Sequence, residues 1–490
     1  MQKTNKIAPK RLVGLGIALL LIITARLLPL PDGLSREGIT AIALLFAALV
    51  MWLTDTMNLA IVTIAVVVLI PFFRIVVPEG SAAANGAVGI PLFRMNVEVT
   101  FQQFAGKVFF FVLATFALTA ALATSSIPER IANFALRISK QNPFKLILFF
   151  LLGSALLSNV LSNVSSAALF SALAIAVIKS FGDPEPGTSQ LAKTLMISVA
   201  LGSMIGGFMS PPSTATNILI IDLLEKSGYI IPFASWMLIG IPAGVIACCI
   251  VATALYIVFK PEKVPLEASQ TAMIRAKEMG SMNMREIKIL IIIALMFVFW
   301  ILSTWVPVFD TTLIALIGMC AFFLPGIEVL TWKQFAENAS WDVLFLIGGV
   351  GALAAGIQTT GAATWFVSSV MSDVASWSPF GIALATSAIV CLLHVVNPSG
   401  PAVAGLAAAP MIAVAISSNG VVNPIPMALI TAFWSSTAFI FPTDAVTVLT
   451  YRYGHYKMTE LVKFGWLPTI VLVFVMALII PLFTRLVMGI

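Results

Sequence analysis

The sequence predicts an all-α, polytopic membrane protein of about eleven transmembrane helices and two re-entrant hairpins, in two inverted-topology repeats with discontinuous helices. Of its 490 residues, 60% are hydrophobic and only 10% are charged, whereas soluble domains carry about 25% charged residues. Apolar runs close to the roughly 20 residues that cross a bilayer recur along the chain. Four such segments are interrupted by small, polar or proline residues, and the interruptions occur in matched pairs.

Spans are expected where long apolar runs lie between charged or turn-forming residues. They cover residues 12–30, 39–54, 57–73, 101–126, 191–224, 231–259, 289–306, 311–328, 341–360, 423–451 and 464–488. Segments 143–178 and 379–417 are too long for one simple span, and each carries a small, polar cluster near its middle. Unpaired backbone inside the hydrocarbon must be buried in protein or line a wet cavity. Both segments are therefore predicted to be re-entrant hairpins.

Basic residues set the predicted orientation. With a cytoplasmic N-terminus and both long segments as hairpins, most of the 27 Lys and Arg residues fall inside, as the positive-inside rule requires. A crossing span in place of the first hairpin would put the basic loop 260–288 outside. We therefore expect a multi-pass protein of the cell inner membrane, surrounded by lipid, with an external C-terminus. The net charge of +6 reports this orientation and does not indicate a nucleic-acid partner.

These elements divide the chain into five predicted regions. Residues 1–100 hold the N-terminal spans, for scaffold and dimerisation, and 453–490 hold the C-terminal span. The transport elements of the two repeats lie in 101–225 and 341–452. Residues 226–340 link the repeats and include the cytoplasmic loop.

An internal repeat supports this division. Residues 110–125 match 345–360, residues 161–169 match 395–403, and residues 213–219 match 443–449. Each unit consists of a span, a hairpin and a broken span, and the two units enter the membrane from opposite sides. Inverted repeats with discontinuous helices are typical of alternating-access transporters, whose binding site lies at the paired interruptions.

The broken spans indicate the chemistry of that site. Pro211 and Pro212 lie among hydroxyl residues at mid-membrane, and proline removes a backbone donor and ends a helix. A break exposes N–H groups that attract anions and carbonyls that attract cations. The matching break lies at 441–447. No Lys or Arg lies at any of the four interruptions. Small residues also favour close helix packing, but four clusters at repeat-equivalent positions favour a binding site.

Motifs along most of the chain are similar to those of one known family. Residues 162–169, with Ser158 one turn earlier, resemble the Ser-Asn-Thr hairpin motif of the divalent-anion:sodium symporters of the di/tricarboxylate transporter type. Gly206-Gly207 followed by Asn217 resembles the family's glycine-rich stretch, and 438–465 resembles its closing signature. The resemblance implies a homodimer that moves a small divalent anion, such as succinate, malate, citrate or tartrate, usually with Na⁺, by an elevator-type motion.

The resemblance also implies the site residues. Substrate-binding positions would be Ser162, Asn163, Val164, Thr214, Asn397, Pro398, Ser399, Gly400 and Ala445. Candidate ligands of Na⁺, or of another coupling ion such as H⁺, would be Ser158, Ser162, Asn163, Ser213, Asn397, Thr443 and Asp444. No cofactor is implied.

Two departures from the family pattern concern the hairpins. Val164 stands where the family has Thr, which removes one hydroxyl, and the second hairpin has no Ser-Asn-Thr motif. Repeat matching aligns Asn397 with Asn163, whereas spacing back from Pro410 places residues 400–402 in the motif. Both registers remain open from the sequence, and the second cation site depends on the choice.

Asp444 and His394 are the ionisable residues placed deepest in the predicted membrane. An intramembrane carboxylate marks a functional site by default, so Asp444 is a candidate cation ligand or proton carrier. The alternative is a helix cap. A lone His on an apolar helix is more often a hydrogen-bonded packing residue than a proton carrier.

Three functions compete at this stage. The first is a coupled anion transporter, by Na⁺ symport or by anion exchange, and the short loop 260–288 favours carboxylates over sulfate. The second is a proton- or cation-coupled antiporter, although the four interruptions supply only one carboxylate. An enzyme is disfavoured because the chain has two His residues and no His-Glu-x-x-His motif.

Overall fold

A computed structural model defines the fold. It describes residues 9–54, 56–77, 91–127, 130, 142–159, 162–180, 184–263, 279–306, 308–362, 365, 369, 377–397, 400–418, 420–440 and 444–490. Within these residues all regular structure is helical. The helices are α1 (Pro9–Leu27), α2 (Arg36–Leu53), α3 (Leu59–Phe72), α5 (Leu92–Phe104), α6 (Lys107–Ala123), α8 (Pro143–Ser158), α9 (Asn163–Ser180), α10 (Gln190–Met209), η1 (Pro211–Ser213), α11 (Ala215–Lys226), α12 (Phe233–Phe259), α14 (Met284–Leu302), α15 (Thr311–Phe323), α16 (Trp332–Asn338), α17 (Trp341–Thr359), α20 (Pro379–Val396), α21 (Gly400–Ser417), α22 (Pro424–Ser436), α23 (Ala445–Tyr451) and α24 (Met458–Met488).

Both predicted hairpin segments fold as two helices joined by a short break. The pairs α8–α9 and α20–α21 begin alike, with a side-chain cap followed by proline at the first helical position. Asn142 accepts from the amide of Lys145 before α8, and Ser378 accepts from the amide of Gly381 before α20. Such a cap is worth about 1 kcal/mol, and proline at this position sacrifices no helical hydrogen bond.

Both predicted broken spans are interrupted in the structure. The first consists of α10, the single turn η1 and α11, and the second of α22 and α23. Thr214 and Asp444 cap the second halves, each through a side chain that accepts a backbone amide two or three residues on. The local sequence therefore restarts each helix after the break.

The two repeats interlock through these elements. In each repeat the first hairpin helix packs on the first half of the broken span, α8 on α10 and α20 on α22. The second hairpin helix packs on the second half of the other repeat's broken span, α9 on α23 and α21 on α11. This exchange brings both hairpin breaks and both span breaks to the middle of the molecule.

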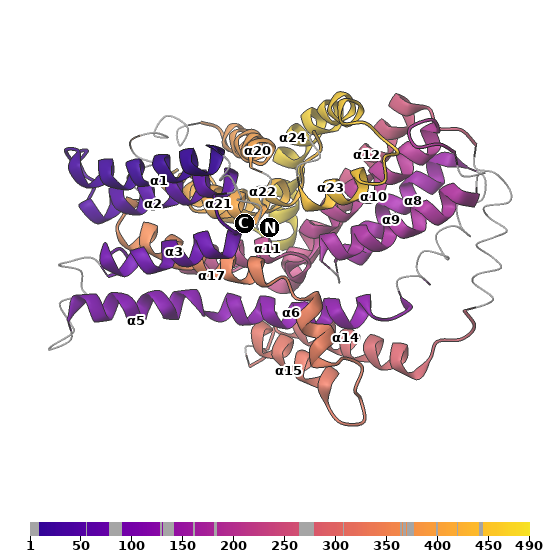
Figure 1. Ribbon diagram of the computed structural model, residues 1–490, viewed down its shortest axis with the longest axis horizontal. Helices are drawn as coiled ribbons and strands as arrows, with labels where there is room; N and C mark the ends of the chain where they lie inside the picture. The colour runs from indigo at the N-terminus through magenta and orange to yellow at the C-terminus, as the bar shows by residue number, and fades with distance from the viewer. Residues whose placement is uncertain are drawn as a thin grey trace, which may run out of the picture.

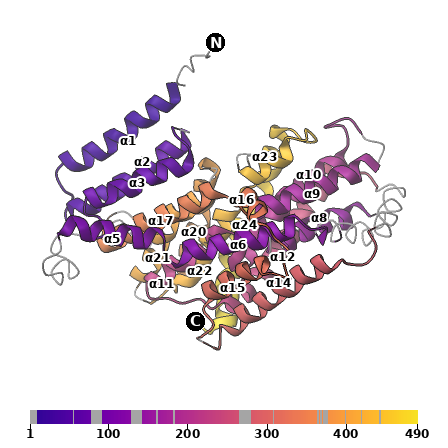
Figure 2. The same cartoon turned by 60° about the horizontal axis from the view of Figure 1, so that its bottom comes forward.

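The N-terminal helices form a separate group. Helices α1, α2 and α3 lie together at one end of the molecule in both views, and α8, α9 and α10 lie at the other end (Figures 1 and 2). Leu44 of α2, Ile70 of α3 and Leu353 of α17 belong to a hydrophobic cluster distinct from the main core. Helix α17 connects the two because it packs on α3 and also on α21.

The observed helices agree only partly with the membrane spans that the sequence predicts. The predicted span 101–126 is two helices, α5 and α6, separated at Ala105 and Gly106. By length and composition, six helical segments of the described chain could each cross a membrane, namely Leu92–Ala123, Gln190–Met209, Phe233–Phe259, Trp341–Thr359, Gly400–Ser417 and Met458–Met488. The count of about eleven spans and the re-entrant course of the hairpins stay predictions.

Candidate functional site

A cavity of about 300 Å³ lies where the four interrupted elements meet. This is the size of a small-molecule site. Its lining includes the predicted residues Ser162, Asn163, Val164, Ser213, Thr214, Gly400 and Asp444. Apolar walls come from Val112 and Phe116 of α6 and from Val343 of α17. Among the described residues that line it, Asp444 is the only charged one.

Several helices begin at the cavity, three of them with their first described residue in its lining. Asn163 is the first residue of α9, Gly400 is the first residue of α21, and Ala215, also in the lining, is the first residue of α11. The leading N–H groups of a helix carry partial positive charge and have no partner within the helix. Three such ends around one space create an anion-binding environment without a basic side chain.

Asn163 is held from two sides in the first repeat. Its Oδ1 lies 3.0 Å from the Ser158 hydroxyl, which also donates to the Ser203 carbonyl at 2.8 Å. The Asn163 amide packs directly on Gly207, where an added Cβ would lie 2.5 Å from Oδ1. Ser158 is buried and is not part of the cavity lining. Of the predicted ligands of the first cation site, Ser158 and Asn163 are therefore in direct contact, with Ser158 behind Asn163.

Polar side chains fix the backbone of the first broken span. The Asn217 amide nitrogen donates to the carbonyls of Gly207 at 2.7 Å and Ser210 at 2.8 Å. Ser210 and Ser213 share a hydroxyl contact of 2.7 Å. The Ser210 hydroxyl also donates to the Asn159 carbonyl at 3.0 Å, which ties the break to the first hairpin.

In the second hairpin the described part of α21 starts at Gly400, directly after residues that lie outside the described chain. Gly400 lines the cavity, as Asn163 does in the first hairpin. Asn397 ends α20 as its C-cap, is buried, and is not among the residues that line the cavity. Both registers of the second hairpin motif stay predictions.

Asp444 and His394 both have structural contacts. The Asp444 carboxylate is half-buried, caps α23 by accepting from the Val446 amide at 2.8 Å, and also reaches the cavity. The buried His394 ring approaches the carbonyls of Trp434 at 2.6 Å and Thr437 at 3.1 Å through Nδ1. His394 thus makes the hydrogen bonds of a packing residue through Nδ1, whereas its Nε2 has no partner among the described residues.

Three predicted residues, Pro398, Ser399 and Thr443, lie outside the described residues. Of Ala445 the structure describes only its place as the first residue of α23. These positions stay predictions.

Sequence reasoning missed six polar residues of the lining. Ser435 and Ser436 end α22, Thr115 and Thr119 lie on α6, Thr216 lies on α11, and Ser340 precedes α17. The available signal was the Ser-Ser-Thr run at 435–437, which interrupts an otherwise apolar stretch before the predicted break. Among the described residues no cluster of three or more His, Cys, Asp or Glu side chains could hold a metal ion. A cation here would therefore rely on hydroxyl, amide and backbone oxygens, which are hard ligands.

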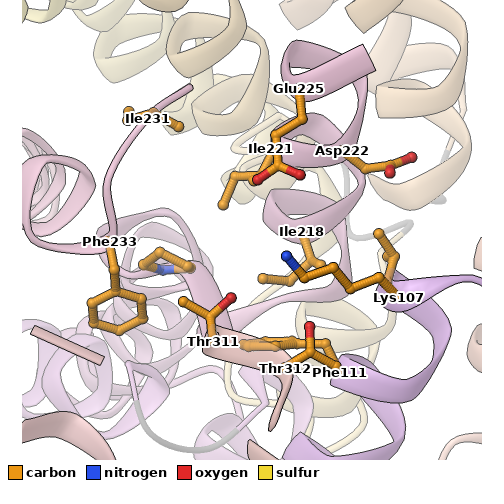
Figure 3. Close-up of a pocket in the computed structure, with 12 residues that line it drawn as sticks. Lys107, Phe111, Ile218, Ile221, Asp222, Glu225, Ile231, Phe233, Thr311 and Thr312 are labelled. Atoms are coloured by element: carbon orange, nitrogen blue, oxygen red, sulfur yellow. The ribbon is translucent and has the colours of Figure 1, made fainter. Parts of the chain in front are cut away.

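A second cavity, of about 80 Å³, lies beside Lys107, Asp222 and Glu225 (Figure 3). Its lysine is already paired, because Lys107 Nζ lies 2.8 Å from Asp310. Burial and the neighbouring Asp222 raise the pKa of Glu225, and Lys107 opposes that rise. No predicted site residue lines this space, so the larger cavity is the candidate site.

The chain shares its fold with solved transporters. It superposes on the YdaH transporter of Alcanivorax borkumensis with a TM-score of 0.57 and 11% identity, covering 88% of this chain and 99% of that one. The antimetabolite efflux pump MtrF of Neisseria gonorrhoeae gives a TM-score of 0.54 at 12% identity, covering 96% of this chain and 95% of that one. At these identities the likeness shows the fold alone.

Proteins that match by sequence share more identity with this chain than these solved structures do. The sodium-dependent dicarboxylate transporter SdcS of Staphylococcus saprophyticus is 24% identical over 505 residues, covering 98% of this chain and 92% of that protein. Its Staphylococcus aureus counterpart is 26% identical over 388 residues, covering 74% and 71%. An uncharacterized transporter of Haemophilus influenzae is 26% identical over 450 residues, covering 89% and 90%.

The family model for the sodium:sulfate symporter transmembrane region matches residues 9–490. This match runs through both hairpins and both broken spans. It confirms the resemblance on which the motif analysis relied. The chain is a transporter that belongs to the sodium:sulfate symporter family, the divalent-anion:sodium symporters.

Proposed function

We propose that this protein is an Na⁺-coupled symporter of dicarboxylates of the succinate type. The observation that carries the proposal is the cavity into which three helix N-termini open, lined by hydroxyls and, in the described part of the chain, by no Lys, Arg or His. Each helix end favours an anion by about 0.3–1 kcal/mol at an exposed site and by more when partly buried. A dianion held only by dipoles and hydroxyls beside Asp444 needs added positive charge, which Na⁺ supplies.

The coupling ion would bind behind the substrate. Ser158, Asn163 and the backbone near Ser213 would hold Na⁺ in the first repeat, and Asp444 with the neighbouring Thr443 would contribute in the second. The related SdcS proteins are named sodium-dependent dicarboxylate transporters, which favours Na⁺ over H⁺ and carboxylates over sulfate.

Movement would follow the elevator pattern in a homodimer. The N-terminal helices share with α17 a hydrophobic cluster apart from the main core, which supports a scaffold that meets the transport elements along that helix. Ion pairs and hydrogen bonds join segments that the topology puts on one side of the membrane, as for Arg130 with Glu286 and Lys107 with Asp310. This pairing supports the proposed order of membrane crossings, whereas the cytoplasmic N-terminus and the inner membrane rest on the distribution of basic residues.

The proposal is tested by uptake of labelled succinate into proteoliposomes. Three driving forces are compared: an inward Na⁺ gradient, a proton gradient, and internal unlabelled dicarboxylate. Uptake that follows the Na⁺ gradient is the expected result. Uptake driven only by internal dicarboxylate would make the protein an exchanger, and absence of uptake under all three conditions would overturn the dicarboxylate assignment.

A further inference from the structure

Two serines at the end of α22 have hydroxyls that no described residue uses. Ser435 and Ser436 are 0% and 6% exposed, and both line the candidate cavity. Neither Oγ atom has a hydrogen-bond partner in the described part of the chain. Buried polar groups are paired in the great majority of cases, so two adjacent exceptions in a cavity need an explanation.

Neighbouring hydroxyls of the same helix behave differently. Thr431 donates to the carbonyl of Met427 and Thr437 donates to the carbonyl of Phe433, both at 2.8 Å. This donation to the preceding turn is the usual way in which a helical hydroxyl uses its proton. Ser435 and Ser436 make no such hydrogen bond, so each hydroxyl proton lacks an acceptor in the described chain.

The carbonyls at the end of α22 are occupied by other groups. His394 Nδ1 approaches the carbonyls of Trp434 and Thr437. Gly400 packs so closely on the Ser435 carbonyl that no Cβ could be accommodated there. The end of the helix is therefore held in place from two sides, and the two serines are fixed beside the start of α21.

The two repeats differ in which element places a polar side chain at the cavity. In repeat one the hairpin supplies Asn163, and Gly207 of the broken span makes room for it. In repeat two the hairpin supplies Gly400, and the broken span supplies the serines. Among the described residues of repeat two, α22 therefore offers hydroxyl side chains to the cavity next to Gly400.

We propose that the Ser435 and Ser436 hydroxyls donate hydrogen bonds to one carboxylate of the transported dianion, next to the N-terminus of α21. This inference rests on the proposed function. An unused proton requires an acceptor, and a carboxylate oxygen is the strongest one that the proposed substrate offers. Ser435 and Ser436 are therefore substrate-binding residues, distinct from the cation ligands.

The test measures succinate binding and transport by Ser435→Ala, Ser436→Ala and the double variant. We expect KM and Kd for succinate to rise about tenfold in the double variant, because hydrogen bonds to charged groups are among the stronger ones. At saturating succinate, the half-saturating Na⁺ concentration should stay within about twofold of wild type, since only the anion subsite is altered.

Ser171→Ala is the matched control. Ser171 is also fully buried with an unpaired hydroxyl among the described residues, but it does not line the cavity. It should leave both constants unchanged, and the melting temperature of each variant shows whether it is folded. The inference would be overturned by an unchanged KM and Kd for succinate in a folded double variant, or by a rise only in the half-saturating Na⁺ concentration. Wild type that neither binds nor transports succinate would instead overturn the proposed function.

Discussion

At the scale of single residues, Asp444 combines two roles that substitution can separate. Asn caps a helix as well as Asp does, so Asp444→Asn should keep α23 folded while it removes the charge from the cavity. We expect the half-saturating Na⁺ concentration for uptake to rise at least about tenfold. Asp444→Ala removes the cap as well and should lower stability by about a further 1 kcal/mol. Unchanged Na⁺ dependence in the Asn variant would reduce Asp444 to a cap.

A substitution at Gly207 tests the predicted first cation site, also at the scale of single residues. Its Cα faces the Asn163 amide, and an added Cβ would lie 2.5 Å from Oδ1. Gly207→Ala should displace Asn163 at a cost of about 1–3 kcal/mol and raise the half-saturating Na⁺ concentration in an uptake assay. Gly16→Ala is the control, because a Cβ on Gly16 meets no atom within 4 Å. Equal Na⁺ dependence in the two variants would contradict the packing described for Asn163.

At the scale of elements, the start of α10 depends on a carboxylate from a distant segment. Glu262 accepts from the amides of Gln190 at 2.9 Å and Leu191 at 2.6 Å. Burial by itself would raise the pKa of Glu262, but these backbone hydrogen bonds outweigh it and hold the pKa below its ordinary value. The ionised carboxylate therefore stabilises the N-terminus of α10, with which the chain enters its first broken span.

The resulting pH dependence has a definite sign. A carboxyl whose pKa is lowered on folding contributes stability above its unfolded pKa and loses it as the pH falls through the folded value. Glu262→Gln should lower the stability of the purified protein at pH 7 by at most about 1 kcal/mol, since the site is largely exposed. Melting temperatures of the two proteins should converge below about pH 4.5. A constant difference across that range would contradict the assignment.

At the scale of the whole molecule, the predicted orientation in the membrane can be determined by cysteine labelling. Val308 is 83% exposed between two predicted spans, on the side assigned to the outside. The Lys333 side chain is 84% exposed on the side assigned to the cytoplasm. In a background without the four cysteines, a membrane-impermeant maleimide added to intact cells should label Val308→Cys and spare Lys333→Cys until the membrane is opened. The reverse pattern would invert the topology.

Much of the architecture follows from local sequence. The helix–break–helix course of 143–178 and 379–417 was predictable because proline, a capping residue and a central polar cluster mark each segment. Both broken spans were predictable for the same reason. The division of 101–126 into α5 and α6 was not predicted, although Gln102, Gln103, Gly106 and Lys107 interrupt the apolar run at that place.

The sequence by itself determined the class of protein and the paired interruptions, because hydropathy and helix breaking are local properties. Only the tertiary structure shows that Ser435 and Ser436, at the end of α22, meet the cavity beside Gly400 and the first hairpin. The contacts that His394 and Gly400 make with this end of α22 join residues about 35–45 positions apart, which packing fixes and local pattern does not record.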